Sequence, residues 1–95
     1  MDIKDSRVLI PDEIVLQQVE NESVVINLLT EKYFGLDEIG TQIWIAITST
    51  SSIQEAIEEL LSEYEVGKNH LEQDVFELAQ ELEEFGLISF IPASK

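Results

Sequence analysis

The sequence predicts an α+β domain in which a three-stranded antiparallel sheet is followed by three helices. Two observations lead to that prediction. Between residues 14 and 36, runs rich in Val, Ile and Leu alternate with short polar clusters, as in strands joined by tight turns. From Asp37 onward, apolar residues recur at helical spacing and are interrupted by polar or glycine-containing breaks. This order of elements is typical of a winged helix-turn-helix type of domain.

Two turns organise the predicted sheet. The polar cluster 20–23 separates strands at 14–19 and 24–29, and it contains Asn21, a residue type able to take the left-handed conformation in a turn. A second turn at 30–32 leads into an aromatic strand at 33–36. Strands joined by such short turns pair antiparallel, so the first and third strands should be the edges of the sheet.

Capping residues mark the expected start of each helix. Asp37 is the expected N-cap of the first helix, and Ser52 with Glu55 forms a capping box for the second. Asn69 with Glu72 repeats this pattern before the third helix. Each helix then carries one apolar stripe that should face the core. The stripes are Ile39, Ile43, Trp44 and Ile47; then Ile53, Ile57, Leu60, Leu61 and Tyr64; then Leu71, Val75, Leu78, Ala79, Leu82 and Phe85.

Glycines mark where the second and third helices should end. Gly67 and Gly86 each follow an apolar stripe, and glycine tolerates the left-handed conformation that closes many helices. After Gly86, residues 87–91 are expected to form a last short strand before Pro92. We find no repeat and no long linker, so residues 1–95 should form a single domain with its core at about 14–90.

Charge and hydropathy exclude several classes of partner. The chain has 20 acidic and 5 basic residues, for a formal net charge of -15, and its cations are scattered. Nucleic acids and anionic membranes require clustered Lys and Arg, so neither is an expected partner. No apolar run is long enough to span a membrane, and the N-terminus lacks the pattern of a signal peptide. Together with the absence of cysteine, this favours a cytoplasmic protein.

The same inventory argues against an enzyme. There is no cysteine, the single histidine is His70, and the glycines form no phosphate or dinucleotide motif. The many carboxylates alternate with core positions and are interpreted as solvated helix faces. We therefore expect no catalytic residue, no metal and no cofactor. A DNA-binding role is also disfavoured, because the third helix has no Lys or Arg between Leu71 and Phe85.

Two features point instead to binding of a peptide. The strand at 32–36 should be an exposed edge, and an edge offers unpaired N–H and C=O groups to an added strand. Tyr33 and Phe34 must lie on opposite faces of that strand, although the sequence does not show which one faces the core. Phe76 falls at the margin of the third helix's apolar stripe. It is expected either to pack at the boundary of the core or to line a groove between this helix and the third strand.

The order of motifs resembles the PqqD-like family. Residues 33–44 read Tyr-Phe-Gly-Leu-Asp-Glu-Ile-Gly-Thr-Gln-Ile-Trp, similar to that family's aromatic strand followed by Leu-Asn/Asp-x-x-Gly-x-x-Ile-Trp. The family often has Asn where this chain has Asp37, and we expect the cap to survive. Residues 53–66 resemble its second helix, and residues 74–88 its closing helix with a Gly-Leu-Ile end. The resemblance covers about residues 14–90.

The resemblance implies a recognition element for ribosomally synthesised, post-translationally modified peptides. Such proteins bind the leader of a precursor peptide as an added strand and present it to a leader peptidase or a modifying enzyme. The free-standing form with Tyr-Phe-Gly-Leu favours the lasso-peptide type; delivery to a radical SAM enzyme and an acidic winged-helix regulator are the alternatives. Carried onto this chain, the peptide-binding residues would be Lys32, Tyr33, Phe34, Gly35, Leu36, Val75, Phe76, Ala79 and Leu82, with Glu72 and Glu83 favouring a basic leader.

Overall fold

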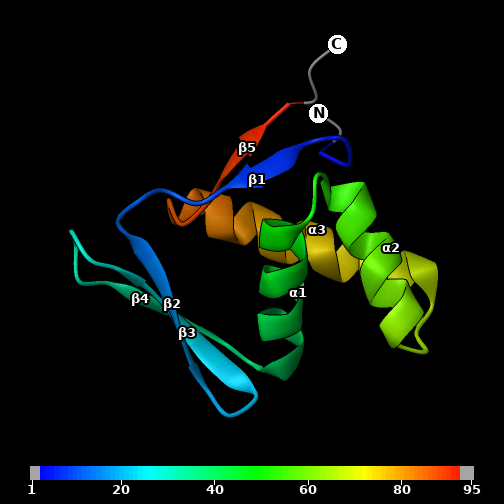
Figure 1. Cartoon of the computed structure of the whole chain (residues 1–95), viewed down its shortest axis with the longest axis horizontal. Coiled ribbons are helices and arrows are strands. Elements are labelled where there is room, and N and C mark those ends of the chain that lie inside the picture. Colours follow the sequence, from blue (N-terminus) through cyan, green and yellow to red (C-terminus); the bar gives the residue numbers. More distant parts are fainter. Residues whose placement is uncertain (1–2, 93–95) are drawn as a thin grey trace.

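The computed structural model describes residues 3–92, which form two small sheets and three helices (Figure 1). Strands β2 (Ile14–Val19), β3 (Glu22–Asn27) and β4 (Tyr33–Leu36) make one antiparallel sheet in that order. Helices α1 (Glu38–Ser49), α2 (Ile53–Glu63) and α3 (Lys68–Glu84) follow along the chain. The predicted α+β class, the order of the elements and the two edge strands are confirmed.

The two hairpins of this sheet close through residues with positive φ. In the first hairpin Val19 pairs with Glu22, leaving a two-residue turn in which Glu20 has a φ of 57°. The left-handed residue of this turn is thus Glu20, one position before Asn21, the residue whose type suits that conformation. In the second hairpin Glu31 has a φ of 63°, and the Asn27 side chain accepts hydrogen bonds from the backbone N–H groups of Leu29 and Thr30.

A second sheet joins the two ends of the described chain. Strand β1 (Arg7–Leu9) pairs antiparallel with β5 (Ser89–Ile91) (Figure 1). The register places Val8 opposite Phe90. The expected strand after Gly86 is confirmed. Its partner β1 was not predicted, because three residues are too few to show an alternating pattern.

The observed helix ends confirm two of the three predicted caps. The Asp37 carboxylate accepts a hydrogen bond of 2.7 Å from Gly40 N–H, and the Ser52 hydroxyl accepts one of 3.1 Å from Glu55 N–H. The prediction for α3 is wrong: its N-cap is Gly67, with no side-chain hydrogen bond, and Asn69 already lies inside the helix. Gly67 also does not close α2, since its φ is -66° and the C-cap of α2 is Tyr64.

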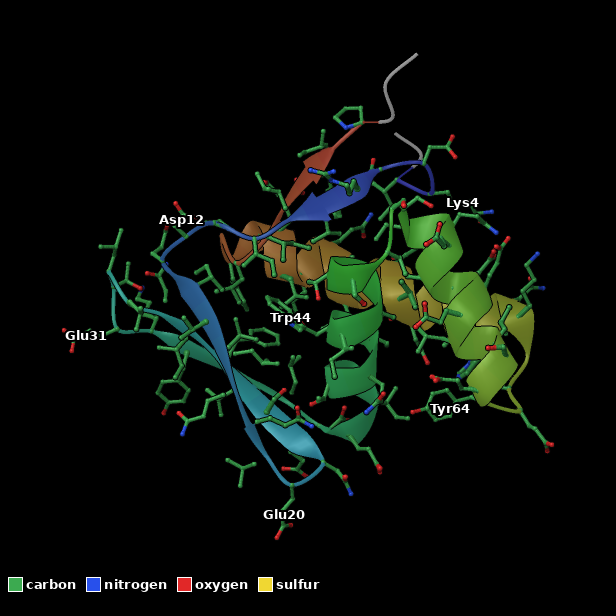
Figure 2. The ribbon with its side chains drawn as sticks, viewed as in Figure 1. Lys4, Asp12, Glu20, Glu31, Trp44 and Tyr64 are labelled. Atoms are coloured by element: carbon green, nitrogen blue, oxygen red, sulfur yellow. The ribbon has the colours of Figure 1, made fainter. Side chains whose placement is uncertain are left out.

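The core lies where the three helices meet each other and one face of the three-stranded sheet. Trp44 of α1 is buried there (Figure 2), and the hydroxyls of Ser23 and Thr41 form a buried hydrogen bond of 2.7 Å that joins β3 to α1. Two predicted stripe residues are not part of the core. Ile39 is 47% exposed and Phe85 is 59% exposed, because both lie at a helix end on the flank that faces β4 rather than the packed centre.

No helix in the part of the chain that the structure describes is both long enough and apolar enough to cross a membrane.

Candidate binding site at the sheet edge

Strand β4 has an open edge. Its neighbour β3 occupies one side, and no described strand pairs with the other. The register identifies which backbone groups point outward. Asn27 N–H donates to the carbonyl of Lys32, so these two residues form a hydrogen-bonded pair, and such pairs alternate along an antiparallel ladder.

The alternation makes Phe34 and Leu36 the β4 residues that bond to β3, opposite Val25 and Ser23. The N–H and C=O groups of Tyr33 and Gly35 therefore point away from β3, toward the open edge. The β2–β3 hairpin agrees with this assignment. Val19 and Glu22 flank its two-residue turn and form a hydrogen-bonded pair, so the even-numbered residues of β3 bond to β2 and the odd-numbered ones bond to β4. The open edge therefore offers four backbone groups to a ligand: the N–H and C=O of Tyr33 and those of Gly35.

An apolar groove runs beside this edge, between β4 and α3. One part lies against the start of α1, where Leu36 and Ile39 face Leu78. The other part lies where Phe34 meets Phe85 and Leu87. Phe34 lines both parts, so they form one continuous surface along the strand. We call this surface the edge groove.

Two aromatic rings form the wall at one end of the edge groove. The ring centroids of Phe34 and Phe85 are 5.3 Å apart, with an angle of 56° between the ring planes. Phe85 is held by the end of α3: Gly86 N–H donates to Glu83 C=O, and Leu87 N–H donates to Leu82 C=O. These two bonds, with a φ of 74° at Gly86, make a Schellman motif, which confirms Gly86 as the residue that ends the helix.

Carboxylates border the edge groove along its length. Asp37 precedes α1, and Glu77 and Glu81 lie on the α3 wall. Asp74 also lines the groove, and its Oδ2 lies 3.5 Å from Nε2 of His70. A ligand that fills the apolar groove therefore meets carboxylates along the α3 wall and at the start of α1, which favours Lys or Arg next to its apolar residues.

The structure distinguishes the two aromatic residues of β4. Phe34 lies opposite the fully buried Val25 and is partly buried against the core, so it faces the helices. Tyr33 lies opposite Ile26 on the other face and is 76% exposed. Phe34 is therefore the aromatic residue that lines the groove over its whole length, while Tyr33 reaches only its end.

The groove wall predicted on α3 needs a correction. Phe76 does not line the edge groove, because about 160° of helical rotation separates it from Leu78. Glu72 and Glu83 share the flank of Phe76, and Glu72 Oε2 lies 3.6 Å from Nζ of Lys4, on the side of α3 away from β4. The groove lies along the other margin of the apolar stripe, and Phe76 is partly buried against the core, as the boundary-packing interpretation of this residue predicts.

The other predicted residues of α3 lie beneath the groove. Val75, Ala79 and Leu82 are completely buried, so they support its wall from the core side. Their direct contact with a ligand stays a prediction, and the exposed Phe85 with the half-buried Leu78 are better placed for such contact. Sequence reasoning assigned both of these residues to the core. The signal that was available is their position on the flank of the stripe opposite Phe76.

The predicted residues of the strand lie together at the site. Lys32, Tyr33 and Phe34 line one end of the edge groove, and Gly35 and Leu36 continue it toward α1. Within residues 3–92, no group of three or more His, Asp or Glu side chains is arranged to hold a metal ion.

The fold and the groove define a class: a winged helix-turn-helix type of α+β domain with an open sheet edge beside an apolar, acid-bordered groove. The family model described as coenzyme PQQ synthesis protein D (PqqD) matches residues 22–88. The chain therefore belongs to the PqqD family.

Two solved structures resemble the chain. One, described as TbiB1 in complex with the TbiA(beta) leader peptide, is 29% identical, with a TM-score of 0.76 over 84% of this chain and 93% of that chain. The other, described as lasso peptide synthetase B1 complexed with the leader peptide, is 24% identical, with a TM-score of 0.77 over 87% and 98% of the two chains. A search of curated proteins finds no significant match.

Proposed function

We propose that this chain is a non-catalytic protein that binds the leader of a ribosomally made precursor peptide and presents it to a leader peptidase and cyclase in lasso peptide biosynthesis. The observation that carries the proposal is the open edge of β4, with the backbone groups of Tyr33 and Gly35 pointing outward beside the edge groove.

Strand addition explains why both features occur together. The backbone of an added peptide supplies partners for the edge N–H and C=O groups, and this interaction is independent of the peptide's sequence. Every second side chain of the peptide then points toward α3, because side chains alternate along a strand. Those side chains would cover Phe34, Leu78 and Phe85, and this apolar contact would supply the selectivity.

The comparisons support this reading. TbiB1, which shares 29% of its residues with this chain, is described in complex with a leader peptide, and so is the lasso peptide synthetase B1 protein. Both descriptions name a bound leader peptide, and the second also names a lasso peptide synthetase, which is why we propose the lasso branch rather than delivery to a radical SAM enzyme. The regulator alternative is weakened by α3, which carries six carboxylates and one lysine where a recognition helix needs positive charge.

A binding measurement tests the proposal. A fluorescently labelled leader, taken from the precursor gene beside the gene for this chain, should bind saturably in an anisotropy titration. The same peptide with its residues scrambled should not compete. Absence of binding to every leader encoded nearby would refute the proposal, and a gel shift on the upstream DNA at low salt would instead support the regulator.

A further inference from the structure

The face of the three-stranded sheet that turns away from α1 is strongly apolar. Side chains alternate between the two faces along each strand. The buried Val25 and Ser23 and their cross-strand partners on β2 and β4 lie on the face toward the core. The alternate positions lie on the other face, which we call the outer face. The outer-face residues are Val15, Gln17 and Val19 of β2, Glu22, Val24 and Ile26 of β3, and Tyr33 and Gly35 of β4.

Exposure shows that no described element covers the outer face. Val15 is 40% exposed, Val19 61% and Tyr33 76%, and the register places Val15, Ile26 and Tyr33 side by side across the three strands. Leu29, in the turn beside this row, is 78% exposed. An antiparallel sheet with one wet face normally carries polar side chains there, so this face has the composition of a contact surface.

The charge around the outer face indicates what kind of partner fits it. Glu20 and Glu31 lie at the two turns of the sheet, at its opposite ends (Figure 2), and Glu22 lies on the face itself. A second copy of this chain would bring the same carboxylates, and another net charge of -15, against these groups. The complementary partner is a different protein whose apolar contact area is bordered by Lys and Arg.

The outer face is continuous with the proposed peptide site. A strand added to β4 extends the same sheet, so every second side chain of the peptide joins the row of Tyr33 and Gly35. A protein docked on the outer face would therefore touch the bound peptide as well. We propose that the outer face is the docking surface for the enzyme that processes the bound peptide; this inference rests on the proposed function.

The test separates docking of the enzyme from binding of the peptide. Val15→Glu places a charge on the outer face, in the row that Val15 forms with Ile26 and Tyr33. Ile45→Glu on α1, where Ile45 is 39% exposed, is the matched control. Leader affinity is measured by anisotropy. The rate at which the leader peptidase encoded beside this gene cleaves the precursor is measured at saturating peptide. The double variant Val15→Thr with Val19→Thr keeps β-branched residues in β2 and repeats the test if Val15→Glu does not fold.

The inference predicts that Val15→Glu lowers the cleavage rate at least tenfold while leader affinity stays within twofold of wild type, and that Ile45→Glu changes neither. Wild-type cleavage by the Val15 variants would overturn it. A loss of leader affinity as large as the loss of cleavage rate would also overturn it. So would a wild-type dimer that Val15→Glu dissociates, because the outer face would then be the contact between two copies. If the wild-type protein binds no leader, it is the proposed function that fails.

Discussion

Replacing Phe85 with Ser should weaken binding of the leader more than it weakens the fold. Phe85 is 59% exposed, although it contacts Phe34 across the end of the edge groove. A fully covered aromatic side chain buries roughly 150–250 Å². The part of Phe85 still available to a ligand is therefore roughly 120 Å².

At about 25 cal/mol per Å², covering that area completely would contribute about 3 kcal/mol, and covering half of it about 1.5 kcal/mol. Since about 1.4 kcal/mol corresponds to a factor of ten in affinity, Phe85→Ser should raise the leader Kd by about 10-fold to 100-fold. The lost ring contact with Phe34 should cost the fold only about 0.5–1.5 kcal/mol, a fall in Tm of several degrees.

The assay is an anisotropy titration with the labelled leader, accompanied by thermal unfolding of each variant. Val19→Ser is the matched control, because Val19 is 61% exposed but lies on the outer face, away from the edge groove. The reasoning is refuted if Phe85→Ser binds the leader as tightly as wild type, or if both variants lose the same affinity.

Three further predictions follow from the geometry. Gly35→Pro removes an N–H that points away from β3 and should abolish leader binding in the same titration. Gly35→Ala, whose Cβ would meet open space, should bind the leader normally. Equal binding by the two variants would contradict pairing at this edge. The affinity for a basic leader should fall as the salt concentration is raised. Glu81→Lys should weaken leader binding and flatten this salt dependence, while Glu59→Lys on α2 should change neither. Identical salt series for the Glu81 and Glu59 variants would contradict the acidic border of the groove. Thr41→Val leaves the buried Ser23 hydroxyl without its partner and should lower the free energy of unfolding by about 1–3 kcal/mol in urea titrations; an unchanged midpoint would show that this bond does not secure β3 to α1.

Local patterns predicted the elements of the fold well. The meander, the caps at Asp37 and Ser52, and the end of α3 at Gly86 each depend on a few neighbouring residues, and all are confirmed. Strand β1 was missed because its pairing with β5 joins residues about 80 positions apart, and a three-residue segment carries no periodicity of its own.

The groove was harder to predict because it depends on the rotation of α3 against the sheet. The apolar stripe shows which side of a helix is buried, but Phe76 and Phe85 lie on opposite margins of that stripe and are equally hydrophobic. Which margin faces β4 is decided by tertiary packing. The sequence could not show which of Tyr33 and Phe34 faces the core for the same reason. Alternation places the two side chains on opposite faces of the strand, but tertiary packing decides which face is buried.

The central claim, that the leader adds as a strand to β4, is tested most directly by residue-resolved amide hydrogen exchange with and without the leader. The amides of Phe34 and Leu36 bond to β3, so they should be protected in the free protein and change little. The amides of Tyr33 and Gly35 face the open edge and should become protected only when the leader is present. If the leader binds while these two amides continue to exchange rapidly, strand addition at this edge is contradicted.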